Sequence, residues 1–263
     1  MITLLIDMDG VLTKDKEFNP FPHAREFIRK LKESRVPFRI VSNNSTRSPN
    51  LIVHKLKVKG FNINGEDFIS PVGVLPEFLK KEGVSSLFVI GTHMLRDFLS
   101  ESGFEVRNDH KVECVVIGQD KEIDFLKIKT AVSAVFLNKA RIVPVNLSRI
   151  VKDSDSLYFP GAGSYARFIA QTTGYEHELP NLGKPSPDFI KLALKGLPEE
   201  EVFLISDDIY TDLMGAKELG IKTIFMTTGK YREEELQKAK FEPDYIFHDL
   251  RELENKIFEW LKG

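Results

Sequence analysis

The sequence has almost no cysteine, no long apolar run and little net charge, and each shortage excludes a class of protein. The single cysteine, Cys114, excludes an intramolecular disulfide, and the apolar stretch VECVVIG around it indicates a core residue rather than a nucleophile. The opening MITLLI stops at Asp7, too soon for a membrane span or a secretion signal, so we expect a cytoplasmic protein. Lysine and arginine number 37 against 39 acids, which argues against nucleic-acid and membrane partners.

What is present is an ordinary globular composition. The chain has 263 residues, of which 42% are hydrophobic and 29% charged. This length allows one large domain or two smaller ones with their own cores. Lysine and glutamate are abundant and glutamine is scarce, which favours a thermophilic source.

Short apolar or β-branched runs alternate with longer segments of helical spacing along the whole chain. This alternation predicts an α/β fold, a parallel sheet with helices on both faces. Strands are expected at residues 2–7, 37–42, 86–91, 112–118, 141–146, 202–207, 222–228 and 243–248. Helices are expected at residues 23–34, 50–60, 93–103, 122–139, 187–196, 210–220 and 251–263.

Eight strands are more than one compact sheet of this length needs, so we expect two joined α/β units. The candidate hinges are two turn-rich stretches, SPVGV, which begins at Ser70, and ELPNLGKPSP, which ends at Pro187. The predicted core is therefore residues 1–72 and 183–263, and residues 73–182 form an inserted domain.

Two aspartates stand one residue apart at the end of the first expected strand, in LLIDMDGVL. Residues 7 and 9 share a parity in a strand, so Asp7 and Asp9 are expected to point one way and Met8 the other. Open parallel sheets bind ligands beyond the carboxyl ends of their strands. Carboxylates this close require a cation or a shared proton. An N-cap or an Asp-Gly turn would explain Asp9 alone, but not the pair.

Three more acids, Asp207, Asp208 and Asp212, crowd the end of another expected strand, in ISDDIYTDLMGAKELG. Helix N-termini favour acids, so Asp212 alone needs no function. Together with the first pair, however, these acids predict a site for a hard cation. Mg²⁺ takes few carboxylates and usually also binds a phosphate oxygen.

Two further elements have groups that can hold an anion. Ser42 closes a strand in RIVSNNSTR and Asn43 follows it, although S-N-N-S is also an ordinary polar turn. Lys184 lies between glycine and proline in GKPSP, where a tight turn can aim a side chain that is usually solvated. An aspartate pair, a hydroxyl–amide turn, a lysine and an acid cluster are what phosphoryl transfer needs.

The motifs DMDG, SNN, GKPSP and SDDIYTDLMGA occur in this order. On these residues, and over essentially its full length, the chain resembles the haloacid dehalogenase (HAD) superfamily of phosphatases. Its lysine motif and its long insertion, with VVIGQDKEIDFLKI and PGAG, are similar to the p-nitrophenyl phosphatase-like and NagD-like subgroup with a class IIA cap. The resemblance implies a Rossmann-like, doubly wound core with a smaller α/β cap at residues 73–182. It also implies a Mg²⁺-dependent phosphatase that acts on p-nitrophenyl phosphate and on a small phosphorylated metabolite.

The resemblance further implies catalytic roles. Asp7 is the implied nucleophile, which forms an aspartyl-phosphate and divides one hard hydrolysis into two easier steps. Asp9 is the implied general acid and then general base. Ser42, Asn43 and Lys184 are implied to hold phosphoryl oxygens, and the lysine also balances the charge of the nucleophile.

The implied ligands of Mg²⁺ are Asp7, Asp207 and the backbone carbonyl of Asp9. Asp208 and Asp212 are expected to orient these ligands without binding the metal themselves. The fourth motif departs from the family, because Ser206 stands where a glycine is usual. We expect this serine to shift contacts around the site without loss of activity.

Several alternatives stay open at this point. GAGSYA at residues 161–166 fits a dinucleotide fingerprint, but it lies inside the insertion, and a glycine turn that opens a helix explains it as well. A phosphoacceptor receiver module would be about half this length. A phosphotransferase of the same fold or a non-catalytic phosphometabolite sensor has the same motifs.

The stretch VNLSR at residues 145–149 replaces the Asn-Pro-Asp common in relatives, so their specificity does not carry over. The natural substrate, such as a sugar phosphate or a nucleotide, and a homodimer through the cap are left open.

Overall fold

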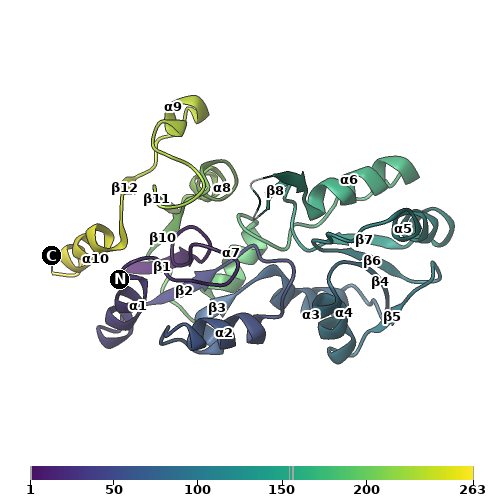
Figure 1. Cartoon of the computed structure of the whole chain (residues 1–263), viewed down its shortest axis with the longest axis horizontal. Helices are drawn as coiled ribbons and strands as arrows, with labels where there is room; N and C mark the ends of the chain where they lie inside the picture. The colour runs from purple at the N-terminus through teal and green to yellow at the C-terminus, as the bar shows by residue number, and fades with distance from the viewer. Residues whose placement is uncertain (1, 154, 156, 263) are drawn as a thin grey trace. The chain divides into compact units, whose positions relative to one another are not determined.

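The computed structural model describes residues 2–153, 155 and 157–262, and the chain separates into two compact units (Figure 1). The first, which we call the core unit, holds the chain up to Ser42, Asn50–Ile69, and the chain from Lys184 onward. The second, the inserted unit, holds Asn43–Pro49 and Ser70–Gly183. Each unit has its own sheet and its own buried apolar clusters.

The core unit is built on a six-stranded sheet in the order β12-β11-β10-β1-β2-β3, in which every pairing is parallel. The central strand β1 is buried at every position, as expected of a strand that helices cover on both faces. The strands are β1 (Ile2–Asp7), β2 (Phe38–Val41), β3 (Phe68–Ile69), β10 (Glu201–Ser206), β11 (Lys222–Met226) and β12 (Tyr245–Phe247).

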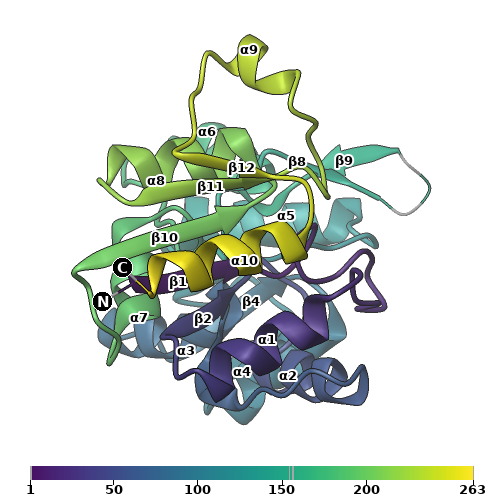
Figure 2. The same ribbon diagram turned by 90° about the vertical axis from the view of Figure 1, so that its left-hand side faces the viewer.

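Helices cover both faces of this sheet, which makes the core unit doubly wound. Leu4 and Ile6 on β1 pack into a cluster with α1, α2 and α10, whereas Leu5 packs into the opposite cluster with α7 and α8. Figure 2 shows α1 and α10 lying along the same side of the sheet. The helical segments are α1 (Ala24–Glu33), α2 (Pro49–Val58), η1 (Gly65–Asp67), α7 (Pro187–Leu194), the π-helical turn η2 (Ile209–Leu213), α8 (Met214–Glu218), α9 (Glu235–Ala239) and α10 (Leu250–Trp260).

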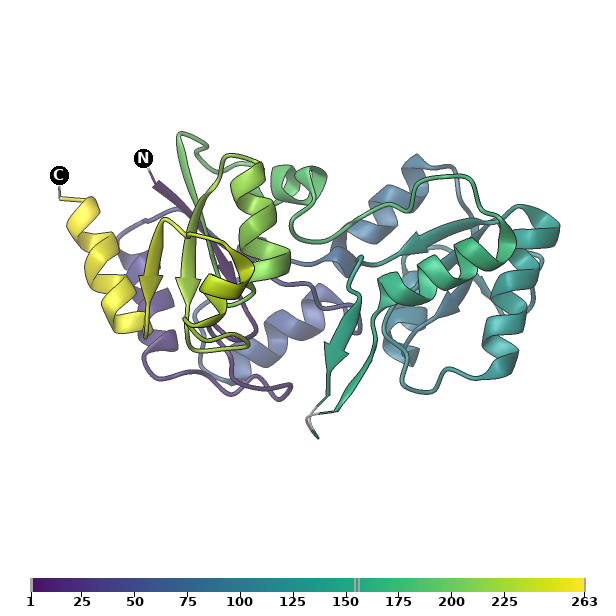
Figure 3. The same cartoon turned by 90° about the horizontal axis from the view of Figure 1, so that it is seen from above.

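The inserted unit is a smaller α/β structure. Its four-stranded parallel sheet has the order β5-β4-β6-β7, and β8 and β9 form a separate antiparallel pair. Helices α3 and α4 cover one face of the parallel sheet, and α5 and α6 cover the other (Figures 1 and 3). The segments are α3 (Pro71–Lys81), β4 (Ser86–Ile90), α4 (His93–Glu101), β5 (Glu105–Arg107), β6 (Cys114–Ile117), α5 (Phe125–Asn138), β7 (Arg141–Pro144), β8 (Ile150–Lys152), β9 (Tyr158–Pro160) and α6 (Ala162–Thr173).

The segment Asn43–Pro49 packs within the inserted unit, although it directly follows the second motif. Thr92 Oγ1 donates to the carbonyl oxygen of Thr46 at 2.8 Å. Asn146 Nδ2 donates to the carbonyl oxygen of Asn43 at 2.8 Å. These donors follow the carboxyl ends of β4 and β7, so the inserted sheet holds the segment by its backbone. This segment was predicted to belong to the core, because nothing in SNNSTR indicates partners so far along the chain.

All eight expected strands are present, with ends within about two residues of the expected ones. Four strands of two or three residues, β3, β5, β8 and β9, were missed, because such short runs carry no periodic signal. The stretch that begins at Ser70 is the start of α3, with Pro71 in its first turn, and it lies at the boundary between the two units. Cys114 is fully buried on β6, which confirms its place in a core. No helix in the described part of the chain has the length and apolar character that a membrane crossing requires.

One buried carboxylate ties the last helix of the core unit to the first. Glu254 on α10 is 3% exposed. One of its oxygens lies 2.9 Å from His23 Nε2, and the other accepts a hydrogen bond from Lys30 Nζ at 2.5 Å. Removing a buried charge of this kind leaves its desolvated partners with a weaker acceptor.

We expect Glu254→Gln to lower the free energy of unfolding of the core unit by about 2 kcal/mol, because glutamine keeps the shape but not the charge. Urea unfolding followed by the fluorescence of Trp260 measures it. This residue is the chain's single tryptophan, and its ring stacks on Phe203 within the core unit. The control Glu259→Gln, on the exposed side of α10, should change the same quantity by less than about 0.5 kcal/mol. Equal stability of the two variants would contradict the role of Glu254.

Candidate active site

The carboxyl ends of three neighbouring strands bring predicted site residues to one edge of the core sheet. β1 ends at Asp7, β2 is followed by Ser42, and β10 is followed by Asp207. β1 lies between the other two strands, and Asp7 is in register with Val41 on β2. Asp7 and Asp207 are each 6% exposed, and Ser42 is fully buried. The parallel sheet therefore gathers two acids and a hydroxyl at neighbouring strand ends.

Lys184 lies within a buried ion-pair cluster. Its Nζ is 2.6 Å from Asp7 Oδ1 and 2.7 Å from Asp212 Oδ2, and its side chain is 1% exposed. Ser206 Oγ lies 3.1 Å from Asp7 Oδ2 and 2.8 Å from Asp212 Oδ2, so its hydroxyl can donate to either carboxylate. The serine that replaces the usual glycine thus sits between the acids that share the lysine. These contacts join four residues from three separate stretches of the chain.

The turn that aims Lys184 is fixed by its own packing. Ser186 Oγ accepts a hydrogen bond from Phe189 N at 3.2 Å, so Ser186 is the N-cap of α7. A Cβ added to Gly215 would lie 2.2 Å from Pro185 Cγ, so α8 approaches the turn as closely as only glycine permits. The lysine therefore projects from a turn that is held on both sides.

Burial dominates the electrostatics of the cluster. Burial raises the pKa of Asp7, and Lys184 opposes that rise. Burial also raises the pKa of Asp212 to about 6, again against the effect of Lys184. The pKa of Asp207 lies well above its usual value because of burial and of the charge on Asp7. Burial alone would lower the pKa of Lys184, but Asp212 and Asp7 raise it overall. Asp7 and Asp212 thus share one buried ammonium and Asp207 is a third buried carboxylate, which leaves two negative charges in excess when all four groups are ionised.

The carboxylate of Asp207 lies in a close cradle of backbone. A Cβ added to Gly10 would lie 2.2 Å from Asp207 Oδ2, and one added to Gly229 would lie 2.0 Å from it. Thr228 Oγ1 donates to the carbonyl oxygen of Gly10 at 2.6 Å, which joins the two loops that form the cradle. Both glycines are therefore required by the position of this carboxylate.

This donor set fits a hard divalent cation. The predicted ligands are the side chains of Asp7 and Asp207 and the backbone carbonyl of Asp9, which are all oxygens. A charge of two would offset the excess negative charge of the buried cluster. Within the described residues, no three His, Cys, Asp or Glu side chains are grouped as a metal site. The predicted set is of another kind, since it has two side chains and one backbone oxygen.

Asp9 lies just beyond the end of β1. It forms a backbone bridge with Thr13 and is half-buried, and its charge contributes to the raised pKa of Asp7. Met8 is fully buried in the cluster beneath α1. Because the strand ends at Asp7, strand alternation does not fix the direction of the Asp9 side chain. The direction of the Asp9 side chain stays a prediction.

A loop that holds two of the acids was not predicted. The backbone N–H of Lys230 donates to Asp207 Oδ2, and Lys230 Nζ pairs with Asp208 Oδ2 at 2.9 Å. Asp208 Oδ1 accepts from Thr211 N at 3.0 Å as the N-cap of η2. Both oxygens of Asp208 thus have partners of their own, so Asp207 is the stronger candidate ligand. The available signal was TTGK directly after β11, the parallel strand beside β10.

Asn43 differs from the other predicted residues because it belongs to the inserted unit. Asn146, which donates to its carbonyl oxygen, is 3% exposed and accepts from Ser148 N at 3.1 Å. A Cβ added to Gly183 would lie 2.4 Å from Asn43 Oδ1, so the residue before the motif lysine must be small. Asn146 was not predicted, although it lies in the stretch VNLSR that departs from the relatives.

Close packing accounts for the glycines of GAGSYA. A Cβ added to Gly161 would lie 2.4 Å from the carbonyl oxygen of Ser148, and one added to Gly163 would lie 2.5 Å from the backbone of Leu147. The start of α6 therefore approaches residues 147–148 directly. This packing explains the glycines without a bound dinucleotide.

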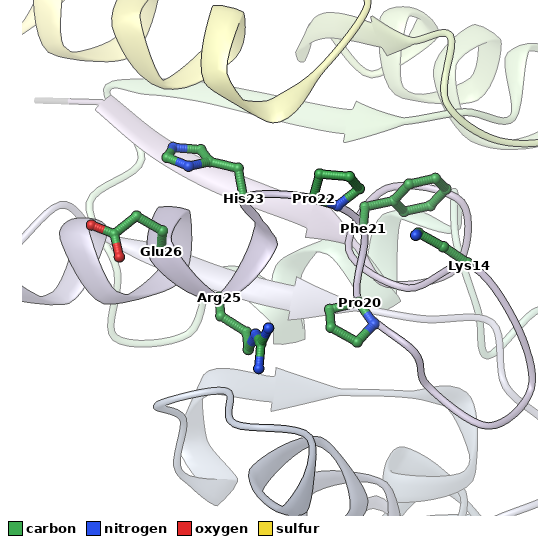
Figure 4. A pocket seen from close by; sticks show the side chains of 7 residues that line it. All are labelled: Lys14, Pro20, Phe21, Pro22, His23, Arg25 and Glu26. Carbon is green, nitrogen blue, oxygen red and sulfur yellow. The ribbon is translucent and has the colours of Figure 1, made fainter.

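A cavity of about 370 Å³ lies beside the loop that precedes α1 and includes none of the predicted site residues. Figure 4 shows that its charged side chains lie apart from one another. The lining residues are Lys14, Pro20, Phe21, Pro22, His23, Arg25 and Glu26.

Comparisons with known proteins point in one direction. Residues 4–105 match the family model described as haloacid dehalogenase-like hydrolase, and residues 181–253 match a second, described as HAD-hydrolase-like. The acid sugar phosphatase of Staphylococcus epidermidis is 29% identical over 249 residues, which are 94% of each chain. The p-nitrophenyl phosphatase from Archaeoglobus fulgidus has 28% identity and a TM-score of 0.85, over 97% of this chain and 98% of its own. The glycerol phosphate phosphatase of Mycobacterium tuberculosis, solved in complex with magnesium, has a TM-score of 0.77 over 95% of this chain and 75% of its own. At 24% identity, this last likeness is one of fold.

We expect Gly229→Ala to weaken Mg²⁺ binding at least about tenfold, because the added Cβ would displace the carboxylate of Asp207. Isothermal titration of the metal-free protein with Mg²⁺ measures the affinity. The control is Gly65→Ala, since a Cβ at Gly65 would meet no atom within 4 Å. If the two variants bind Mg²⁺ equally well, Asp207 is not a ligand.

Proposed function

Because the chain belongs to the haloacid dehalogenase-like hydrolases, in the NagD-like subgroup, and is a phosphoric monoester hydrolase, we propose that it works through an aspartyl-phosphate on Asp7. The observation that carries this proposal is the buried contact between Lys184 Nζ and Asp7 Oδ1 at the end of the central strand. This contact fixes one carboxylate at the gathered strand ends and offsets part of its charge. A carboxylate held in this way is suited to attack an electrophile that enters from the sheet edge.

The proposed reaction has two displacements at phosphorus. In the first, an oxygen of Asp7 forms a bond to phosphorus while the bond to the leaving oxygen breaks, and Asp9 gives that oxygen a proton. In the second, Asp9 takes a proton from water, and the water oxygen attacks phosphorus. The bond between Asp7 and phosphorus then breaks and inorganic phosphate is released.

Ser42, Asn43 and Lys184 are proposed to hold the phosphoryl oxygens. Lys184 keeps its charge during the reaction, because both carboxylates that contact it raise its pKa. When Asp7 becomes an acyl phosphate it loses its charge, and Asp212 still holds the lysine at 2.7 Å. The ammonium then remains in place. The negative charge that faces it is now that of the phosphoryl group instead of that of the Asp7 carboxylate.

We propose Mg²⁺ as the cofactor, held by the side chains of Asp7 and Asp207 and the carbonyl oxygen of Asp9. Two observations support Mg²⁺ as the cofactor: the donor set consists of oxygens alone, and the buried cluster has an excess of negative charge. When bound, Mg²⁺ offsets the charge that builds up on the nucleophile and the phosphoryl group.

We propose that residues 73–182 act as a cap that selects the substrate and excludes water. The relatives named acid sugar phosphatase and p-nitrophenyl phosphatase support a sugar phosphate or a similar small phosphometabolite as substrate, with p-nitrophenyl phosphate as a convenient assay. Transfer to a sugar hydroxyl would give a new phosphoester instead of inorganic phosphate, so product analysis separates the two reactions. The cytoplasmic location, the thermophilic source and the lack of nucleic-acid and membrane partners stay predictions from composition.

The first experiment is hydrolysis of p-nitrophenyl phosphate with and without Mg²⁺. We expect metal-dependent release of p-nitrophenol that falls at least about a thousandfold in Asp7→Asn, while the fluorescence of Trp260 shows an intact core unit. Asp188→Asn is the matched control, because Asp188 is exposed on the first turn of α7. A near-normal rate in Asp7→Asn would mean that another group attacks phosphorus. No release from a folded wild type that binds Mg²⁺ would favour a sensor.

The acid role of Asp9 predicts a dependence on the leaving group. We expect Asp9→Asn to slow the hydrolysis of an alkyl phosphate by about 10²–10⁴-fold, and that of p-nitrophenyl phosphate less, because p-nitrophenolate leaves without a proton. The measurement is the pH–rate profile of both substrates in wild type and variant. An unchanged profile, with equal slowing of the two substrates, would remove Asp9 from proton transfer.

A further inference from the structure

The parallel sheet of the inserted unit reverses its strand order between β4 and β6. Along the chain, β4 is followed by β5 on one side of it, whereas β6 lies on its other side and β7 lies beyond β6. The helices that follow β4 and β6 cover opposite faces, α4 one face and α5 the other. Open parallel sheets bind ligands outside the carboxyl ends of their strands at such a reversal. The carboxyl ends of β4 and β6 are therefore the place in this unit where a ligand is expected.

The segment Asn43–Pro49 of the chain itself occupies this place. Gly118 directly follows β6, and a Cβ added to it would lie 2.9 Å from the carbonyl oxygen of Ser45. Thr92 follows β4, and its Oγ1 donates to the carbonyl oxygen of Thr46 at 2.8 Å. The segment therefore contacts both strand ends that flank the reversal, and it does so with its backbone.

The side chains that hold the segment have fixed orientations. Asn146 follows β7, and its Nδ2 donates to the carbonyl oxygen of Asn43 at 2.8 Å while its Oδ1 accepts from Ser148 N at 3.1 Å. Both polar atoms of this buried amide thus have partners. Thr92 Oγ1 likewise accepts a backbone N–H as the N-cap of α4 while it donates to Thr46. The turn is therefore held at Asn43 and again at Thr46 by groups that cannot reorient without losing a second hydrogen bond.

The turn between these two points is closed by its own side chain. Asn44 Oδ1 accepts from the backbone N–H groups of Thr46 at 3.0 Å and of Arg47 at 3.1 Å. An asparagine that bonds the backbone two and three residues further on stabilises a turn without other partners. Because the turn is closed in this way, Asn146 and Thr92 hold one compact piece of chain rather than two separate points.

The peptide group between Ser42 and Asn43 is anchored on both sides. Ser42 is fully buried, and its N–H donates to the carbonyl oxygen of Ile69 at 3.2 Å. On the other side, the carbonyl oxygen of Asn43 accepts the hydrogen bond from Asn146. This peptide group carries the N–H of Asn43. The hydrogen bonds on its two sides therefore fix the direction in which that N–H points.

We propose that the inserted sheet uses its ligand crevice to hold the phosphate-binding turn, with Asn146 and Thr92 as positioning residues for the N–H of Asn43. This inference rests on the proposed function, because it takes Asn43 to hold a phosphoryl oxygen. Donors that are already oriented bind an anion more tightly than mobile donors, since they need no ordering when the ligand arrives. The inserted unit thus contributes to phosphate binding through the backbone of this turn, whichever substrate is bound.

The test is the affinity of the Mg²⁺-loaded protein for inorganic phosphate, measured by isothermal titration. We expect Asn146→Ala to raise the dissociation constant of phosphate at least about fivefold and to leave that of Mg²⁺ within about twofold, because the predicted metal ligands belong to the core unit. The matched control is Asn138→Ala, which also removes a hydrogen bond from an asparagine Nδ2 to a backbone carbonyl, that of His110, in the same unit.

Two results would overturn the proposal, and they have different meanings. If the wild type binds phosphate and hydrolyses p-nitrophenyl phosphate, but Asn146→Ala binds phosphate as tightly as Asn138→Ala, then Asn146 does not position Asn43 and the proposed function stands. If the folded wild type neither binds phosphate nor hydrolyses the ester, the proposed function and this inference both fail.

Thr92 provides a second test that does not depend on the folding of Asn146→Ala. Thr92→Val keeps the shape of the side chain but removes the hydroxyl that donates to Thr46, whereas Thr92→Ser keeps the hydroxyl. We expect Thr92→Val to raise KM for p-nitrophenyl phosphate at least about threefold with a smaller change in kcat, and Thr92→Ser to restore KM. An unchanged KM in Thr92→Val, or a Thr92→Ser variant as impaired as Thr92→Val, would contradict the positioning role.

Discussion

The buried ammonium of Lys184 is the group on which the rest of the candidate site depends. It contacts Asp7 and Asp212 at 2.6 and 2.7 Å, and both carboxylates are buried. Carboxylates buried without a cation would take up protons, and a protonated Asp7 is no nucleophile. Because the lysine has two carboxylate partners, the proposed reaction of Asp7 would leave it held by Asp212. Asp212 thus holds the lysine in place, although it is not expected to contact the substrate.

The part of the site that follows from the sheet could be predicted from the sequence. Once the apolar runs before Asp7, Ser42 and Asp207 are identified as parallel strands, their ends must share one edge, and the order β10-β1-β2 makes them neighbours. The four motifs supplied this much without any knowledge of packing. The direction of the Asp9 side chain stays a prediction, because β1 ends at Asp7, as expected, and the alternation of a strand does not extend beyond its end.

Contacts between distant stretches could not be predicted in this way. Lys230 reaches Asp207 and Asp208 from the next strand along, and Asn146 reaches Asn43 across about a hundred residues of chain. The glycines show the same limit on prediction from the sequence, because each one makes room for a different kind of neighbour. Gly229 makes room for a carboxylate and Gly163 for a neighbouring backbone, and only the partner tells them apart. Each partner lies so far along the chain that no local pattern records it.

The contact between Asn43 and Gly183 has a consequence for how such a chain can change over evolution. The polypeptide enters the inserted unit after Ser42 and leaves it for the last time before Lys184, and these two passages touch at a glycine with no room for a side chain. The chain returns to the core unit for Asn50–Ile69 between these passages, so the part that can lengthen, shorten or change its fold without displacing a core strand is Ser70–Gly183. Inserted units can therefore replace one another while the strand ends that gather Asp7, Ser42 and Asp207 stay unaltered.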